Sequence, residues 1–222
     1  MSLLEQNLDA VLRSNGMEKS AVLNRYNVTD FSQLTVAQLE HLCVALNCSL
    51  ENILLYPQFV DRSKMRKIKL LILDVDGVMT DAGMFFTESG DQFKKYNAKD
   101  GMAIMALTKA DFQVGIISSG FKLEMVKARA DLLKIQHVYV GRDPKMMILT
   151  DWCAKLGISL EEVAIIGDDI NDLEVMQNIG FSACPADAVP RIKRQVDLVL
   201  QTNGGQGCVR EFIDNYLLEQ PV

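Results

Sequence analysis

The sequence predicts an α/β protein built on a doubly wound, Rossmann-like parallel sheet, with an inserted β-hairpin and a small all-α N-terminal domain. Two observations predict the sheet: short apolar segments recur beyond Lys67, and segments with helical spacing of apolar residues lie between them. Strands this apolar are typical of a parallel sheet that helices cover on both faces. A third observation predicts the helical domain: before residue 62 the apolar residues recur at the spacing of helices, with no segment that reads as a strand.

The N-terminal helices are marked by their start signals. Thr35 and Gln38 have the spacing of a capping box, which predicts a helix that runs to about Leu46. Ser49 precedes the segment LENILL and predicts the start of another short helix. The chain then turns polar and basic, so we place one domain over residues 1–62 and a second over residues 63–222.

The second domain contains five apolar segments that we expect to form strands. They cover residues 68–73, 112–117, 137–140, 163–167 and 197–200. Between them lie helical segments such as KDGMAIMALTKA and PKMMILTDWCAKL. The segments GMFFT and QFKKY, separated by ESGD, predict a β-hairpin inserted after the first strand.

Composition favours a small solute as the partner. The formal net charge of the 222 residues is −6, which argues against general binding to nucleic acid or to an anionic membrane. The five cysteines form no CxxC pair, so we expect reduced, buried thiols and no zinc site. No apolar run approaches the ~18 residues of a membrane span, and the N-terminus lacks a basic leader, so we expect a cytoplasmic protein.

Reactive side chains follow the predicted strands. Asp74 and Asp76 come after the first strand, Ser118 ends the second, and Asp168 follows the fourth, while Lys145 begins a helix. Because the carboxyl ends of the strands of a doubly wound sheet meet at one edge, we expect these residues to form one site. Taken alone, DxD could be an ordinary turn and GDD an ordinary helix N-cap. Because both motifs stand at strand ends that are expected to meet, we favour a catalytic site.

This set of residues predicts phosphoryl transfer. Three carboxylates in one crevice repel each other unless a cation is bound, and oxygen ligands suit Mg²⁺. Lys145 and the hydroxyl of Ser118 are suited to holding the phosphoryl oxygens. We assign Asp74 as the nucleophile that forms an aspartyl phosphate, and Asp76 as the acid that protonates the leaving alcohol and then the base that activates water.

The motifs DVDGVMTD, IISSG, Lys145 and GDDIND resemble those of the haloacid dehalogenase superfamily of phosphatases. The chain from Lys67 to about Leu218 further resembles its capless 3-deoxy-D-manno-octulosonate 8-phosphate and nonulosonate 9-phosphate phosphatases. The segments DGVMTDAGMFF, YNAKDGMAI, PADAVP and GGQGCVRE carry that resemblance. It implies a magnesium-dependent phosphatase of a 2-keto-3-deoxy sugar-acid phosphate, serving lipopolysaccharide or sialic acid-type biosynthesis.

The resemblance also implies roles for individual residues. The metal ligands would be Asp74, the backbone carbonyl of Asp76, and Asp168. Asp169 and Asp172 would lie around these ligands. Ser118 and Lys145 would hold the phosphoryl group, and the candidates for substrate binding are Ser119, Lys99 and Arg210.

Three positions depart from the family pattern. The second motif has Ser118-Ser119-Gly120 where the family commonly has Thr-Gly followed by Arg or Glu. Lys99 stands where octulosonate phosphatases usually carry Arg, and Cys208 stands where the tail motif has Ala. The identity of the sugar acid is therefore left open.

The resemblance implies a homotetramer in which the hairpins pack together and a neighbouring subunit lines part of each active site. The apolar hairpin residues agree with such an interface. Gly204, Gly205 and Gly207 are interpreted as a flexible hinge that lets the tail close over the site, with an ordinary loop as the alternative. Arg210 is suited to gripping a carboxylate.

The first 62 residues fall outside this resemblance. Within them, LTVAQLEHLCVALNCSLENIL resembles the final helices of a Cro/CI-type helix-turn-helix domain. The domain carries more acidic than basic side chains, so we favour a packing module over a DNA reader. A sugar-phosphate-sensing regulatory protein remains the alternative function, and a phosphomutase is disfavoured because no cap is encoded.

Overall fold

The computed structural model describes residues 2–60, 62–120 and 122–218. The chain divides into two compact units, one formed by Met1–Val60 with Asp197–Val199 and the other by Asp61–Val196 with Leu200–Val222. Among the described residues, no helix is long and apolar enough to cross a membrane.

The first unit is helical, as predicted. Its helices are α1 (Leu3–Ser14), α2 (Lys19–Tyr26), α3 (Val36–Ala45) and α4 (Leu50–Leu55), with a 3-10 helix at Phe31–Gln33. The capping box of Thr35 and Gln38 forms, and the side chain of Ser49 caps α4. The 3-10 helix lies between α2 and α3, and residues 46–49 separate α3 from α4.

A buried asparagine holds the ends of this unit together. Asn7 lies on α1, and its Nδ2 donates to the carbonyl oxygens of Ile53 at 2.8 Å and Tyr56 at 2.7 Å. Its Oδ1 accepts from the backbone N–H of Gln58 at 2.8 Å. Because a buried amide is costly when unpaired, these three bonds fix α1 against the chain that follows α4.

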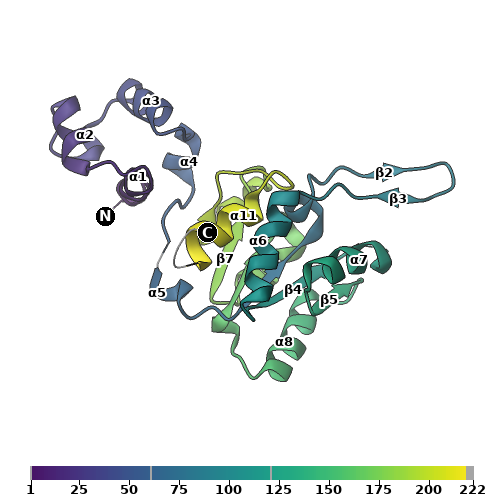
Figure 1. Cartoon of the computed structure of the whole chain (residues 1–222). Helices are drawn as coiled ribbons and strands as arrows, with labels where there is room; N and C mark the ends of the chain where they lie inside the picture. Colours follow the sequence, from purple (N-terminus) through teal and green to yellow (C-terminus); the bar gives the residue numbers. More distant parts are fainter. Residues whose placement is uncertain (1, 61, 121, 219–222) are drawn as a thin grey trace. The chain divides into compact units, whose positions relative to one another are not determined.

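The second unit confirms the predicted α/β fold (Figure 1). The sheet has the order β5-β4-β1-β6-β7-β8; the strands from β5 to β7 belong to the second unit, and their pairs are parallel. The strands are β1 (Leu70–Leu73), β4 (Gln113–Ser118), β5 (His137–Val140), β6 (Val163–Ile166), β7 (Phe181–Cys184) and β8 (Leu198–Val199). β7 was not predicted, because the segment FSAC is short and half of it is small or polar.

Helices connect the parallel strands of the sheet. Helix α6 packs against α7 and α11, and α8 packs against α9. The helices of this unit are α5 (Arg62–Met65), α6 (Ala98–Lys109), α7 (Leu123–Leu133), α8 (Lys145–Leu156), α9 (Leu173–Met176), α10 (Pro190–Lys193) and α11 (Cys208–Phe212). The predicted hairpin forms from β2 (Phe85–Phe86) and β3 (Gln92–Phe93), and Figure 1 shows it extending away from the sheet.

Candidate active site

The first of the predicted site motifs lies at the carboxyl end of β1, where the chain makes a tight turn. Asp74 is buried, and its backbone N–H donates to the carbonyl of Ile166 on β6 at 3.0 Å. The following turn, Val75–Met79, contains Gly77 at φ 87°. A Cβ at Gly77 would lie 2.0 Å from the carboxylate of Asp168, so only glycine lets the turn and the Asp168 side chain lie this close.

Lys145 lies between two buried carboxylates. It is the first residue of α8, and its Nζ lies 2.7 Å from Oδ1 of Asp74 and 2.6 Å from Oδ1 of Asp172. Burial lowers the pKa of Lys145, but the charges of Asp74 and Asp172 outweigh it and raise this pKa above its ordinary value. The ammonium is therefore charged, and its position is fixed from both sides.

Three carboxylates form a compact group at this edge of the sheet. One oxygen from each of Asp74, Asp168 and Asp172 lies within 4.8 Å of the others. Burial, and then the charge of Asp172, raise the pKa of Asp74 to about 7. Burial, and then the charge of Asp74, raise the pKa of Asp168 to about 8. Both shifts mark a site where negative charge is concentrated and a cation is favoured.

Asp172 is more central than the sequence indicated. It is fully buried, and besides pairing with Lys145 it accepts the backbone N–H of Asp168 through Oδ2 at 3.2 Å. Asp169 instead behaves as a helix cap, because its Oδ1 accepts from the N–H of Ile170 at 2.7 Å. The N-cap interpretation of the GDD motif thus holds for its second aspartate only.

Asp76 pairs with a residue that the sequence analysis missed. Its Oδ1 accepts from Nζ of Lys94, which follows directly after β3. The Asp76 carboxyl does not belong to the three-carboxylate group found among the described residues. The hairpin was the available signal, since a hairpin returns the chain to the place from which it left.

The two serines of the second motif have different partners. Ser118 ends β4, is buried, and accepts the backbone N–H of Gly120 through Oγ at 3.2 Å. The Oγ of Ser119 lies 3.3 Å from Nδ2 of Asn171, in the loop that follows β6. The loops after β4 and β6 are therefore in contact.

Among the described residues, no contact is found that joins Lys99 or Arg210 to the three-carboxylate group. The Lys99 side chain is exposed, and its backbone N–H donates to Oδ1 of Asn97 at 2.8 Å. The guanidinium of Arg210 pairs with Asp214, one turn along the same helical segment. Its backbone N–H donates to Oδ1 of the buried Asp100 at 2.7 Å.

The glycine-rich segment packs against the first motif, which favours an ordinary loop over a flexible hinge at Gly204 and Gly205. The N–H of Gly205 donates to the carbonyl of Val78 at 2.9 Å, and the N–H of Gly204 donates to Oδ1 of Asp187 at 2.9 Å. A Cβ at Gly204 would lie 1.9 Å from the carbonyl oxygen of Gly77. These glycines serve close approach between two backbones, and they hold the catalytic turn in place.

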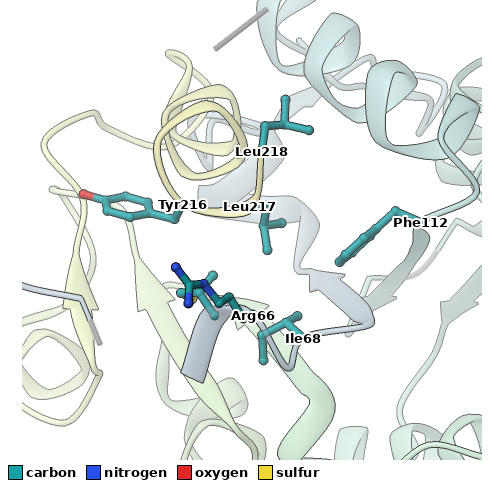
Figure 2. A pocket seen from close by; sticks show the side chains of 7 residues that line it. Arg66, Ile68, Phe112, Tyr216, Leu217 and Leu218 are labelled. Carbon is teal, nitrogen blue, oxygen red and sulfur yellow. The ribbon is translucent and has the colours of Figure 1, made fainter. Parts of the chain in front are cut away.

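A separate pocket of about 560 Å³ lies at the opposite edge of the sheet. Figure 2 shows the side chains that line it, among them Ile68 before β1, Phe112 before β4, and Leu217 near the end of the described chain. None of the predicted site residues lines it. The reactive side chains are therefore gathered at the carboxyl ends of the strands, away from this pocket.

Comparisons with known proteins agree with this geometry. Residues 123–213 match a family described as haloacid dehalogenase-like hydrolase. Over 158 residues the chain is 40% identical to 3-deoxy-D-manno-octulosonate 8-phosphate phosphatase from Escherichia coli (strain K12), which covers 71% of this chain and 84% of that protein.

Solved structures show the same fold. The phosphatase of that name from Yersinia pestis superposes with a TM-score of 0.69 at 37% identity, covering 72% of this chain and 85% of that one. The one from Moraxella catarrhalis, solved in complex with a magnesium ion, a phosphate ion and a KDO molecule, gives a TM-score of 0.68 at 32% identity, covering 72% and 91%.

Proposed function

Since the chain belongs to the haloacid dehalogenase-like phosphatases, in the family of 3-deoxy-D-manno-octulosonate 8-phosphate phosphatase, we propose that it hydrolyses a 2-keto-3-deoxy sugar-acid phosphate through an aspartyl phosphate. The substrate is 3-deoxy-D-manno-octulosonate 8-phosphate or a nonulosonate 9-phosphate. The observation that carries the proposal is the buried array of Asp74, Lys145 and Asp172 at the carboxyl end of β1.

The donor set fits Mg²⁺. Asp74 and Asp168 would hold the ion, together with the backbone carbonyl of Asp76, and these are the hard oxygen ligands that magnesium prefers. The raised pKa values of Asp74 and Asp168 support this assignment, because the site favours either protons or a cation. When bound, the ion neutralises charge on the carboxylates and on the phosphoryl oxygens.

The side chains divide the reaction between them. Asp74 attacks phosphorus while Lys145 and Ser118 hold the phosphoryl oxygens, and Asp76 protonates the departing alkoxide. Asp76 then takes a proton from the water that hydrolyses the aspartyl phosphate. Lys145 is already fixed by Asp172, so little reorganisation is needed when the phosphate arrives.

Substrate recognition beyond the phosphate is assigned to Ser119, Lys99 and Arg210. The contact of Ser119 with Asn171 places it where two loops of the site meet. The Lys99 side chain is exposed, so its ammonium can meet a sugar carboxylate. To bind the substrate, the Arg210 guanidinium must release the Asp214 carboxylate with which it pairs.

Assembly into a homotetramer is part of the proposal. Four large apolar side chains of the hairpin are exposed, by 54% to 64%: Met84, Phe85, Phe86 and Phe93. An apolar patch of this kind favours an interface between copies of the chain. Sedimentation velocity at assay concentration tests this; a fully active monomer contradicts it.

For the N-terminal domain, residues 1–62, we favour a packing or assembly module. The excess of acidic side chains disfavours DNA binding. The alternative, a sugar-phosphate sensor whose N-terminal helices bind nucleic acid or a partner, has less support because a sensor does not need Asp76. A cytoplasmic location is favoured by the five free cysteines, which a reducing compartment keeps as thiols.

A turnover screen tests the function directly. Phosphate release is measured with Mg²⁺ over a panel that contains the two sugar-acid phosphates, glucose 6-phosphate and nucleoside monophosphates. The proposal predicts a clear preference in kcat/KM for one sugar-acid phosphate. Comparable values for hexose phosphates would contradict the substrate class but not the phosphatase activity.

A further inference from the structure

An ion pair joins the hairpin to the catalytic turn. Lys94 follows directly after β3, and its Nζ donates to Oδ1 of Asp76. The pair is shielded from solvent, since the Lys94 side chain is 12% exposed and that of Asp76 is 25% exposed. A partly desolvated, charge-assisted bond of this kind restricts a carboxyl far more than a surface pair does.

The neighbouring residue provides an internal comparison. Lys95 pairs in the same way with Asp81, but these two side chains are 66% and 31% exposed. Both lysines therefore attach the base of the hairpin to the segment that follows β1. Only the Lys94 pair involves a carboxyl of the DxD motif.

Tyr96 lies two residues beyond Lys94. Its hydroxyl is buried and has no hydrogen-bond partner among the described residues. The Cζ atom of Arg129 lies 5.3 Å from the centroid of the Tyr96 ring. Burial, and then the charge of Asp76, raise the pKa of Tyr96 to about 12.

We propose that Lys94 is the positioning residue of the acid/base carboxyl: by binding Oδ1 of Asp76, it leaves Oδ2 to exchange protons with the reacting oxygens. The proposal rests on the proposed function. An ammonium is a donor only, so Oδ1 accepts its hydrogen bond whether or not Oδ2 carries a proton. Lys94 therefore orients Asp76 without competing for the proton that Asp76 transfers.

The reaction forms the aspartyl phosphate in one step and hydrolyses it in a second. A carboxylate oxygen of Asp74 bonds to phosphorus as the bond from phosphorus to the sugar oxygen breaks, and Oδ2 of Asp76 gives its proton to that oxygen. Water then attacks phosphorus as Oδ2 of Asp76 takes one of its protons. The bond between phosphorus and Asp74 breaks, and inorganic phosphate leaves.

Esters with different leaving groups separate this role from a structural one. A sugar alkoxide needs a proton in order to leave, whereas 4-nitrophenolate does not. Lys94→Met is expected to lower kcat/KM for the preferred sugar-acid phosphate about 10- to 100-fold, and that for 4-nitrophenyl phosphate less than about 3-fold. Lys94→Arg should restore most of the loss, because it keeps a charged donor.

Lys95→Met is the matched control, and it should change both kcat/KM values less than about 2-fold because its pair is exposed. In the Asp76→Asn background, Lys94→Met should cause no further loss on either ester, since it acts through Asp76. Circular dichroism on each variant verifies that the fold is retained.

Two results would overturn the assignment: an equal loss on both esters, which indicates a structural or phosphate-binding role, or an unchanged kcat/KM for the sugar-acid phosphate. A wild-type protein that hydrolyses neither ester would instead contradict the proposed function. The two failures are therefore distinguishable.

Discussion

Lys145 and Asp172 form a fully buried ion pair, with Nζ 2.6 Å from Oδ1, that fixes the ammonium against Asp74. Asp172 also accepts the backbone N–H of Asp168, so one carboxylate orders both sides of the site. Buried charges depend on their partners, because water cannot replace them. This pair is the reason that we expect a change at Asp172 to affect both stability and turnover.

Asp172→Asn is expected to lower the free energy of unfolding by about 2 kcal/mol and kcat about 10-fold or more, since Lys145 loses one of its two anionic partners. Denaturant unfolding and steady-state kinetics with Mg²⁺ measure the two effects. The control is Asp151→Asn, which breaks the exposed Lys155–Asp151 pair and should cost less than about 0.5 kcal/mol. Equal, small effects of both variants would contradict a structural role of Asp172.

Gly204→Ala should destabilise the protein and lower kcat together. A methyl group at this position would lie 1.9 Å from the carbonyl oxygen of Gly77, so the catalytic turn must move. The expected cost is about 2 kcal/mol or more, from overpacking. Thermal unfolding and kcat measure the two effects.

The control is Gly90→Ala in the hairpin, where the added methyl meets nothing within 4 Å and only the positive φ of 84° is unfavourable. We expect it to cost about 1 kcal/mol and to leave kcat unchanged. A Gly204→Ala variant with wild-type stability and kcat would restore the hinge interpretation. Cutting the chain before Gly204 should likewise reduce stability as well as kcat/KM.

The stabilising effect of Mg²⁺ should increase with pH. The folded, metal-free protein holds Asp74 at a pKa of about 7 and Asp168 at about 8, both above the ordinary value of 3.8. The folded state therefore binds more protons than the unfolded state between about pH 4 and 8, and its stability falls as the pH rises through this range. Magnesium requires the ionised carboxylates, so it competes with these protons.

The increase in Tm on adding Mg²⁺ should accordingly be larger at pH 8.5 than at pH 6, and Asp168→Asn should remove most of it. Thermal scans at fixed ionic strength, with and without the ion, measure this difference. A Tm increase that does not depend on pH would contradict binding at Asp74 and Asp168.

The sequence predicts the site residues that stand at the carboxyl ends of strands, because the strands can be recognised as short apolar segments. Asp74, Ser118 and Asp168 could be located because each ends or follows an apolar segment, and parallel strands bring their carboxyl ends together. The hairpin was predictable from its turn residues and its flanking apolar residues.

Contacts between segments distant in sequence were not predictable. The pairing of Lys94 with Asp76 depends on where the hairpin returns, and that of Asp172 with Lys145 on how α8 meets the loop after β6. Glycine is ambiguous in a single sequence, since it serves flexibility as readily as close approach. At Gly204 the contact with the Gly77 backbone favours close approach over the hinge interpretation.

Asp74→Asn shows whether Asp74 is the nucleophile, because it keeps the volume of the side chain and removes its negative charge. Phosphate release from the preferred sugar-acid phosphate is measured with Mg²⁺, on protein shown by circular dichroism to be folded. The account predicts a loss of kcat of about 10³-fold or more. Retention of more than about a tenth of wild-type kcat would contradict an aspartyl-phosphate mechanism at Asp74.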